Sequence, residues 1–197
     1  MYRYTKRLGD LFVSSLLLMI LFLPLSLVIL IASFDTQAIG LFTQKRVGIK
    51  GKEFLIFKVR TMKHSELNKS TTTVSNDPRV TFLGAFLRRM KIDELPQLIN
   101  VFLGSMSFVG PRPTVLDDYS RMDDEQKLRS TVKPGITGLA QVSGNTSLSW
   151  PRRLKLDVSY VRNLSLKSDI LILWKTIILI LKDKIHTDPA GSDEWCE

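Results

Sequence analysis

The chain has 197 residues, 44% of them hydrophobic, and a formal net charge of +9. This length fits one domain with an attached membrane segment. The single cysteine, Cys196, excludes an intramolecular disulfide. Residues 40–91 concentrate the basic excess, with 12 Lys and Arg against three acids. Nucleic acid, lipid headgroups and a phosphorylated substrate are the anionic partners that such a stretch allows. The apolar segment just before it favours the last two.

Residues 11–34 contain no charged side chain and are long enough to cross a bilayer, which needs about 20 apolar residues. A cleaved signal peptide fits poorly, because the stretch exceeds an h-region and no A-x-A-like site follows. A plain transmembrane helix is one interpretation. Basic residues on both flanks prefer the cytoplasm, however, and Pro24 kinks a helix near its middle. We therefore expect residues 1–38 to form a re-entrant membrane helix hairpin, with serines satisfying freed backbone groups.

Residues 39–182 are expected to form a cytosolic, interfacial catalytic domain. Within it, residues 39–44 and 54–61, with a turn at Lys50-Gly51, predict a β-hairpin or two short strands. Lys58 and Arg60 would share one strand face, either solvated or in contact with phosphate. Residues 64–78 are polar and predict a loop, which is either a linker or an active-site lid.

Several helices are predicted after this loop, so the expected fold class is α+β and mainly helical. Residues 81–90 predict a short basic helix, and residues 95–102 carry an apolar stripe that Gly104 ends. Another helix opens at Trp150. Residues 170–181 predict a core or interfacial amphipathic helix, with Trp174 and Lys175 at headgroup depth. Residues 183–197 predict a polar tail.

Asp93-Glu94-Leu95-Pro96 permits two interpretations. Asp93 is a good N-cap, and proline is tolerated in a first helical turn, so the segment can be a plain helix start. Pro96 would then stand at N3, where it cannot donate to Asp93, and this leaves the carboxylate capacity for other work. Adjacent carboxylates among many cations also suit a divalent ion, or a nucleophile with its base.

Gly110-Pro111-Arg112-Pro113 fixes one arginine between two prolines. Such rigidity suits bidentate recognition of phosphate. A second glycine-containing loop, residues 133–141, would present Thr137 and Gln141 as polar tips.

Read in order, these motifs resemble the monotopic phosphoglycosyl transferases, a bacterial sugar transferase family, in its minimal catalytic form. The resemblance covers almost the whole chain, and the motifs are specific in this order and spacing. The matching segments are Lys6-Arg7 with Asp10, residues 42–48, 57–62, 93–98, 100–101, 106–113 and 134–142. Leu23, Ser105 and Asn145 depart from the family pattern, which often has Ser, an acidic residue and Arg there.

The resemblance implies transfer of a sugar 1-phosphate from a UDP-sugar to polyprenyl (undecaprenyl) phosphate, with release of UMP and a need for Mg²⁺. It implies Asp93 as a nucleophile that forms an aspartyl phosphosugar, and Glu94 as its base or as an organiser of the metal. Both are thus candidate metal ligands. Candidate substrate or phosphate contacts are Arg112, Lys58, Arg60, Arg79, Arg88, Thr137 and Gln141.

The implied location is the cytoplasmic face of the bacterial inner membrane. The implied partners are the two substrates and membrane lipids, with a homodimer open and no nucleic acid. The alternative function is a non-catalytic, membrane-bound interaction protein in which Asp93 is only a helix cap. That protein would release no UMP from any UDP-sugar.

Overall fold

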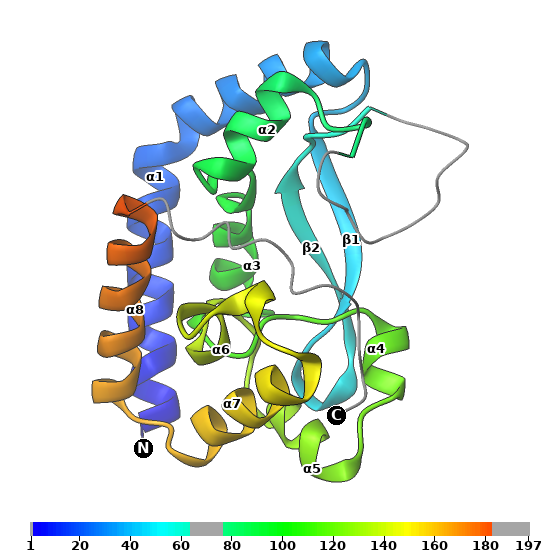
Figure 1. Ribbon diagram of the computed structural model, residues 1–197. Helices are drawn as coiled ribbons and strands as arrows, with labels where there is room; N and C mark the ends of the chain where they lie inside the picture. The colour runs from blue at the N-terminus through cyan, green and yellow to red at the C-terminus, as the bar shows by residue number, and fades with distance from the viewer. Residues whose placement is uncertain (1, 64–76, 183–197) are drawn as a thin grey trace.

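A computed structural model describes residues 2–63 and 77–182 (Figure 1). Its longest element is α1 (Tyr2–Thr36), one helix of 35 residues with Pro24 inside. The first part of α1 runs beside α8, and the second part bends away above α2 (Figure 1). The expected hairpin is therefore one bent helix instead of two separate arms. A single proline removes one backbone hydrogen bond and leaves the rest of the helical ladder intact.

The serines of α1 do not repair this kink. Ser14, Ser15, Ser26 and Ser33 donate to the carbonyls of Leu11, Leu11, Phe22 and Ile29, respectively. None of these is the carbonyl of Ile20, which loses its usual partner because Pro24 has no N–H. The expectation that serines satisfy freed groups was wrong at this position. They give other helix carbonyls a second donor.

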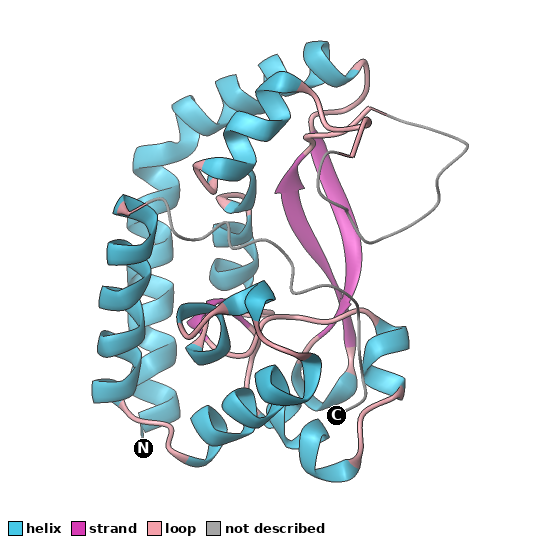
Figure 2. Cartoon of the chain, in the orientation of Figure 1, coloured by secondary structure: helices cyan, strands magenta, loops and turns pink. Residues whose placement is uncertain are grey.

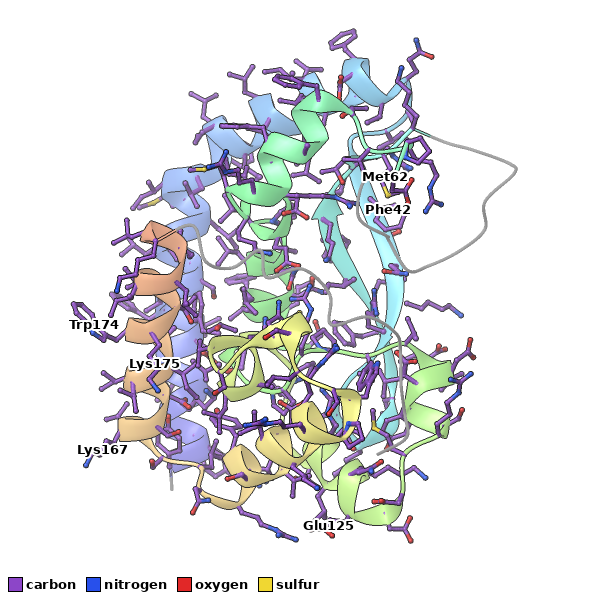
Figure 3. The ribbon with its side chains drawn as sticks, viewed as in Figure 1. Phe42, Met62, Glu125, Lys167, Trp174 and Lys175 are labelled. Atoms are coloured by element: carbon purple, nitrogen blue, oxygen red, sulfur yellow. The ribbon has the colours of Figure 1, made fainter. Side chains whose placement is uncertain are left out.

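α1 is long and apolar enough to cross a membrane, judged by length and composition alone, and it is the one such helix within residues 2–63 and 77–182. Only 11% of its most apolar window is buried. The exposed apolar side chains include Phe12, Met19, Phe22, Leu23 and Phe34. On α8 (Leu166–Leu181), Trp174 is 61% exposed and points outward from the body (Figure 3). Apolar faces of this extent mark contact with a membrane or a partner.

The predicted β-hairpin is confirmed. β1 (Leu41–Val47) pairs antiparallel with β2 (Glu53–Val59) across the short turn η1 (Ile49–Gly51) (Figure 2). Ile56 of β2 packs in a core cluster with Val101 and Met106. We had expected Lys58 and Arg60 to share one strand face. β2 ends at Val59, so Lys58 lies within the strand and Arg60 follows its last residue.

Two helices follow in the part of the chain where they were predicted. α2 (Phe82–Arg89) begins at Thr81, whose side chain accepts from the Gly84 N–H. α3 (Gln97–Leu103) ends at Gly104, which has a φ of 86°. Asn100 fastens α3 to β2, because its Oδ1 accepts from the Phe57 N–H at 3.0 Å and its Nδ2 donates to the Leu55 carbonyl at 2.7 Å.

A second, parallel pair of strands organises the rest of the body. β3 (Ser107–Val109) pairs with β4 (Gly135–Thr137). Between them lie α4 (Leu116–Ser120), α5 (Asp124–Lys127) and η3 (Leu128–Thr131). After β4 come α6 (Leu139–Val142), η4 (Asn145–Ser147), α7 (Trp150–Arg162) and α8. Val109, Tyr160 and Ile172 form the core cluster that joins β3, α7 and α8.

The segment expected as a loop with polar tips, residues 133–141, was misassigned. It contains β4 and most of α6, and Thr137 is 7% exposed. Residues 135–137 form a strand because they pair with β3. The close approach of the two backbones requires glycine at position 135. A Cβ on Gly135 would lie 2.1 Å from the nitrogen of Gly110. Residues 64–76, where the lid or linker was predicted, and the tail at 183–197 lie outside the described residues.

Candidate active site

Asp93 and Glu94 lie in η2 (Ile92–Glu94), a 3-10 turn between α2 and α3. Asp93 is not the N-cap of α3, because that helix starts at Gln97 after Pro96, without any side-chain cap. Pro96 has no N–H, so the α-helical ladder begins only after it. Lys91, just before the turn, has a left-handed φ of 57°. Such strain costs roughly 1–3 kcal/mol and clusters at functional sites. The interpretation of Asp93 as a cap therefore has no support in the geometry.

Glu94 is a buried carboxylate shared by two cations. Its Oε1 accepts from Lys58 Nζ at 2.9 Å and from Arg112 Nη2 at 2.6 Å. Arg112 Nη1 lies 3.4 Å from Oε2. Burial raises the pKa of Glu94, but the charges of Arg112 and Lys58 outweigh it and hold this pKa well below its ordinary 4.5. Glu94 is thus ionised at neutral pH and accepts protons poorly.

Asp93 has the opposite electrostatics. It is 9% exposed, and its Oδ1 has no hydrogen-bond partner within the described part of the chain. Burial and the charge of Glu94 raise the pKa of Asp93, although nearby cations oppose the shift. A buried polar atom without a partner is uncommon and calls for an explanation, such as a catalytic role or a bound ion. Asp93 therefore offers a carboxylate oxygen that no side chain occupies.

Cations from four parts of the chain surround this pair. They are Arg46 of β1, Lys58 of β2, Arg88 and Lys91 at the end of α2, and Arg112 after β3. Burial and the charge of Arg112 lower the pKa of Arg46 to about 10, so Arg46 stays protonated at neutral pH. Burial also lowers the pKa of Lys91. This concentration of positive charge suits a ligand with several negative charges, such as a pyrophosphate.

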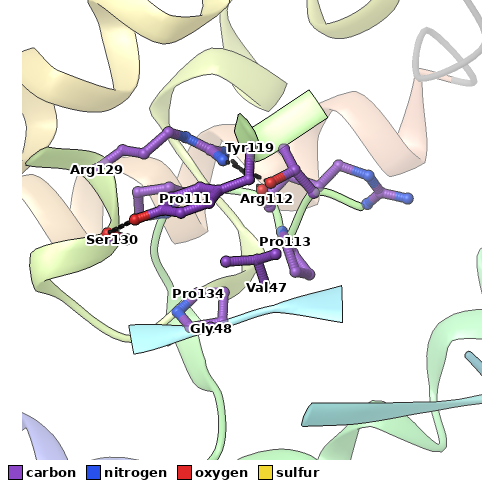
Figure 4. A pocket seen from close by; sticks show the side chains of 10 residues that line it. Val47, Gly48, Pro111, Arg112, Pro113, Tyr119, Arg129, Ser130 and Pro134 are labelled. Atoms are coloured by element: carbon purple, nitrogen blue, oxygen red, sulfur yellow. Dashed lines mark hydrogen bonds between the residues drawn. The ribbon is translucent and has the colours of Figure 1, made fainter. Parts of the chain in front are cut away.

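The backbone around Arg112 is fixed from two sides. The Pro111 carbonyl accepts from the Gly135 N–H at 3.0 Å, and the Arg112 carbonyl accepts from Arg129 Nη2 at 2.6 Å. Arg129 in turn pairs with Asp157, with Nη2 and Nε 2.8 and 3.0 Å from Oδ2. Figure 4 shows Arg129 reaching the Arg112 carbonyl beside a small recess, while the Arg112 side chain extends away from it. The buried pair of Arg129 and Asp157 therefore fixes the backbone position from which the Arg112 side chain extends.

The other predicted contacts divide into two groups. Arg88 belongs with the site, because its charge acts on Asp93 while its Nε donates to Thr61 Oγ1 at 2.8 Å. Arg79 pairs with Asp77, and both act electrostatically on Arg88. Arg60 is used elsewhere: its Nε donates to the Ile39 carbonyl at 2.7 Å, and its guanidinium lies over the Phe42 ring.

Thr137 and Gln141 also make structural contacts. Thr137 Oγ1 lies 2.7 Å from Thr176 Oγ1 of α8, and Gln141 Nε2 donates to the Ile136 carbonyl. Sequence reasoning missed Arg46, Lys91 and Arg129. Lys91 could have been found, since it directly precedes the acidic pair. Arg129 had no such signal, because its partner Asp157 is 28 residues away.

The comparisons with known proteins show that the chain is a transferase, and the apolar α1 suggests that it associates with a membrane. A family model described as bacterial sugar transferase matches residues 1–183, and the chain belongs to this family. It is 38% identical over 189 residues to the exopolysaccharide production protein ExoY of Rhizobium meliloti (strain 1021), in a match that covers 87% of this chain and 83% of that protein.

Two longer relatives carry names that state a reaction. The chain is 39% identical over 184 residues to the UDP-glucose:undecaprenyl-phosphate glucose-1-phosphate transferase of Escherichia coli (strain K12). It is 36% identical over 196 residues to the undecaprenyl-phosphate galactose phosphotransferase of Salmonella typhimurium. The matches cover 89% and 91% of this chain but only 40% and 41% of those proteins.

Proposed function

We propose that the protein moves a sugar 1-phosphate from a UDP-sugar to polyprenyl (undecaprenyl) phosphate and releases UMP. The observation that carries this proposal is the unpartnered Oδ1 of Asp93 beside the triad of Glu94, Lys58 and Arg112. The names of two relatives support the donor and the acceptor. The ring of cations supports a substrate that carries a pyrophosphate.

In the proposed reaction, an Asp93 carboxylate oxygen attacks the phosphorus that bears the sugar. The bond from that phosphorus to the bridging oxygen breaks, and UMP leaves with the bonding electrons. A phosphate oxygen of the polyprenyl carrier then attacks the same phosphorus and restores the Asp93 carboxylate. Neither displacement needs a proton transfer when both nucleophiles are ionised. This agrees with a Glu94 that accepts protons poorly.

Glu94 then serves to position cations and not as a base. It holds Lys58 and Arg112 against one carboxylate, where they can offset the charge of the transferring phosphate. The guanidinium of arginine has five N–H donors, so Arg112 keeps donors free after its contacts with Glu94. Its side chain is 45% exposed and can reach a bound phosphate.

The donor atoms fit Mg²⁺ only with help from the substrate. Within residues 2–63 and 77–182, no three Asp, Glu, His or Cys side chains are grouped to hold a metal. Mg²⁺ is commonly bound by one or two carboxylates plus substrate phosphates. One oxygen of Asp93 would serve, whereas both oxygens of Glu94 already face cations. When bound, Mg²⁺ would offset negative charge on the pyrophosphate.

We also propose that α1 enters and leaves the membrane on the cytoplasmic face of the bacterial inner membrane. Arg3, Lys6 and Arg7 precede its apolar part, and Lys45 and Arg46 follow it. Both flanks therefore prefer the cytoplasm. The bend at Pro24 and the outward apolar side chains of α1 and α8 support the same arrangement.

UMP release tests the proposed reaction. The full chain in detergent is given a panel of UDP-sugars with Mg²⁺ and undecaprenyl phosphate, and UMP is measured. At least one UDP-sugar should give UMP, and Asp93→Asn should abolish its release. Glu125→Gln is the control and should keep wild-type rates. It changes an exposed carboxylate that is far in sequence from the dyad formed by Asp93 and Glu94. An interaction protein would release no UMP with any donor.

A further inference from the structure

A charged groove lies at the N-terminal end of α1, away from Asp93 and Glu94. Its lining includes Arg3, Lys6, Arg7, Asp10, Ser107 and Lys133. Arg7 ties the groove to the C-terminal end of α3, since it donates to the carbonyls of Val101 and Phe102 at 2.6 and 2.8 Å. The dyad precedes the other end of this helix, which is about 10 Å long at 1.5 Å per residue. The groove is therefore separate from the candidate active site.

The groove has more positive charge than its own contacts use. Lys6 pairs with Asp169, and Asp10 accepts from the Phe108 N–H at 3.2 Å. The side chains of Arg3 and Lys133 make no hydrogen bond or ion pair within the described part of the chain. Burial and the charge of Arg7 lower the pKa of Lys133, although the charge of Asp10 opposes the shift. Two cations thus remain available to an anion.

A buried hydroxyl provides an independent indication of a ligand. Ser107 lines the groove, is 1% exposed, and has an Oγ without a partner within residues 2–63 and 77–182. Leaving such a group unpaired costs about 1–3 kcal/mol, and native proteins seldom do so. A phosphate group carries several acceptor oxygens and is a suitable partner for a hydroxyl donor and for cations that line the same groove.

The surroundings of the groove identify the source of the phosphate. Tyr4 and Leu8 of α1 are 82% and 67% exposed, and Leu166 and Ile170 of α8 are 61% and 57% exposed. These side chains lie in the N-terminal parts of α1 and α8, which run side by side (Figure 1) and are joined by the ion pair between Lys6 and Asp169. A molecule with a phosphate head and acyl chains would satisfy the charges and cover this apolar surface together.

We propose that this groove binds the phosphodiester headgroup of an anionic membrane phospholipid. This contact would hold the N-terminal end of α1 at the membrane surface. The site is independent of the proposed transfer reaction. Arg3 and Lys133 supply the charge, Ser107 donates to a phosphate oxygen, and the acyl chains lie against α1 and α8.

Binding of short-chain phosphatidylglycerol to the full chain in non-ionic detergent tests this proposal. The double variant Arg3→Gln/Lys133→Gln should weaken binding at least about 10-fold, as expected when charge-assisted hydrogen bonds are lost. The matched control Arg152→Gln/Lys155→Gln removes the same charge from α7 and should change the dissociation constant less than about twofold. Equal weakening by both variants would show general attraction to the helical body and overturn the proposal.

Ser107→Ala provides a second test that does not depend on removing charge. It should weaken phosphatidylglycerol binding several-fold without lowering the melting temperature, because the lost hydroxyl has no partner in the protein itself. Unchanged binding would exclude Ser107 from the site. Phosphatidylcholine should bind more weakly than phosphatidylglycerol. If inorganic phosphate binds as tightly as the lipid, the groove is a free-phosphate site and the lipid assignment is wrong.

Discussion

Asp157→Asn tests whether the buried pair of Asp157 and Arg129 stabilises the loop around Arg112. Asp157 and Arg129 have side chains only 5% and 6% exposed, and Arg129 also donates to the Arg112 carbonyl. Removing one charge leaves Arg129 as a buried, uncompensated cation, and breaking a buried pair in this way costs about 3–5 kcal/mol. Asparagine keeps one acceptor oxygen, so we expect a loss near 3 kcal/mol. For a chain of this length, that corresponds to a melting temperature roughly 6–12 °C lower.

The assay is thermal unfolding in detergent, with Glu125→Gln as the matched control. Glu125 pairs with Arg162 on the surface, where both side chains are more than half exposed. Breaking that pair should cost no more than about 1 kcal/mol. If Asp157→Asn changes the melting temperature no more than Glu125→Gln does, the buried pair does not stabilise the Arg112 loop. At a temperature where the variant is folded, its KM for UDP-sugar should rise because Arg112 is less well placed.

Four further predictions concern the dyad and the membrane helix. Arg112→Lys keeps the charge but loses the planar fork, so UMP release should fall roughly 30- to 150-fold, and near-wild-type turnover would make Arg112 structural. Because the pKa of Asp93 is raised above 3.8, its carboxylate is protonated more readily in the folded than in the unfolded chain. Stability from this group is thus present at low pH and lost as pH rises through the raised pKa. Asp93→Asn should therefore raise the melting temperature at neutral pH by about 1–4 °C, and a decrease would contradict the account. UMP release should fall as pH drops through the same pKa, at a pH above 3.8, and a rate unchanged across that range would exclude an ionised Asp93 as nucleophile. Cysteines at Tyr4 and Thr43 should both react only with a reagent on the cytoplasmic side, and labelling of either from the periplasm would refute the re-entrant arrangement.

The sequence predicted elements well where a local pattern determines them. The apolar stripe that Gly104 ends predicted α3, and residues 54–61 after the turn at Lys50-Gly51 predicted β2. The prediction of elements failed where segments that are distant in sequence pair with each other. Thr137 was expected at a loop tip and is buried in β4, because the glycines at 110 and 135 let two strands approach closely.

The candidate site was predictable only in part for the same reason. Asp93, Glu94 and Arg112 stand in short motifs whose chemistry can be inferred from spacing. Lys58 was also a predicted candidate, but its contact with Glu94 spans 36 residues and depends on how the hairpin is placed against η2. Arg60, two residues further on, is beyond the end of the strand and turns to Ile39. A one-dimensional pattern cannot distinguish these two cations.

The most direct test of the central claim is intact-protein mass spectrometry after an acid quench. Wild-type protein with a UDP-sugar that supports UMP release and Mg²⁺, but without polyprenyl phosphate, should gain the mass of one sugar phosphate. A burst of UMP, at most stoichiometric with the protein, should accompany this gain, and Asp93→Asn should show neither. If the wild type turns over at full rate with its carrier yet never gains this mass, Asp93 is not the nucleophile. Direct attack by the lipid phosphate, with Asp93 as metal ligand or base, would then replace the covalent mechanism.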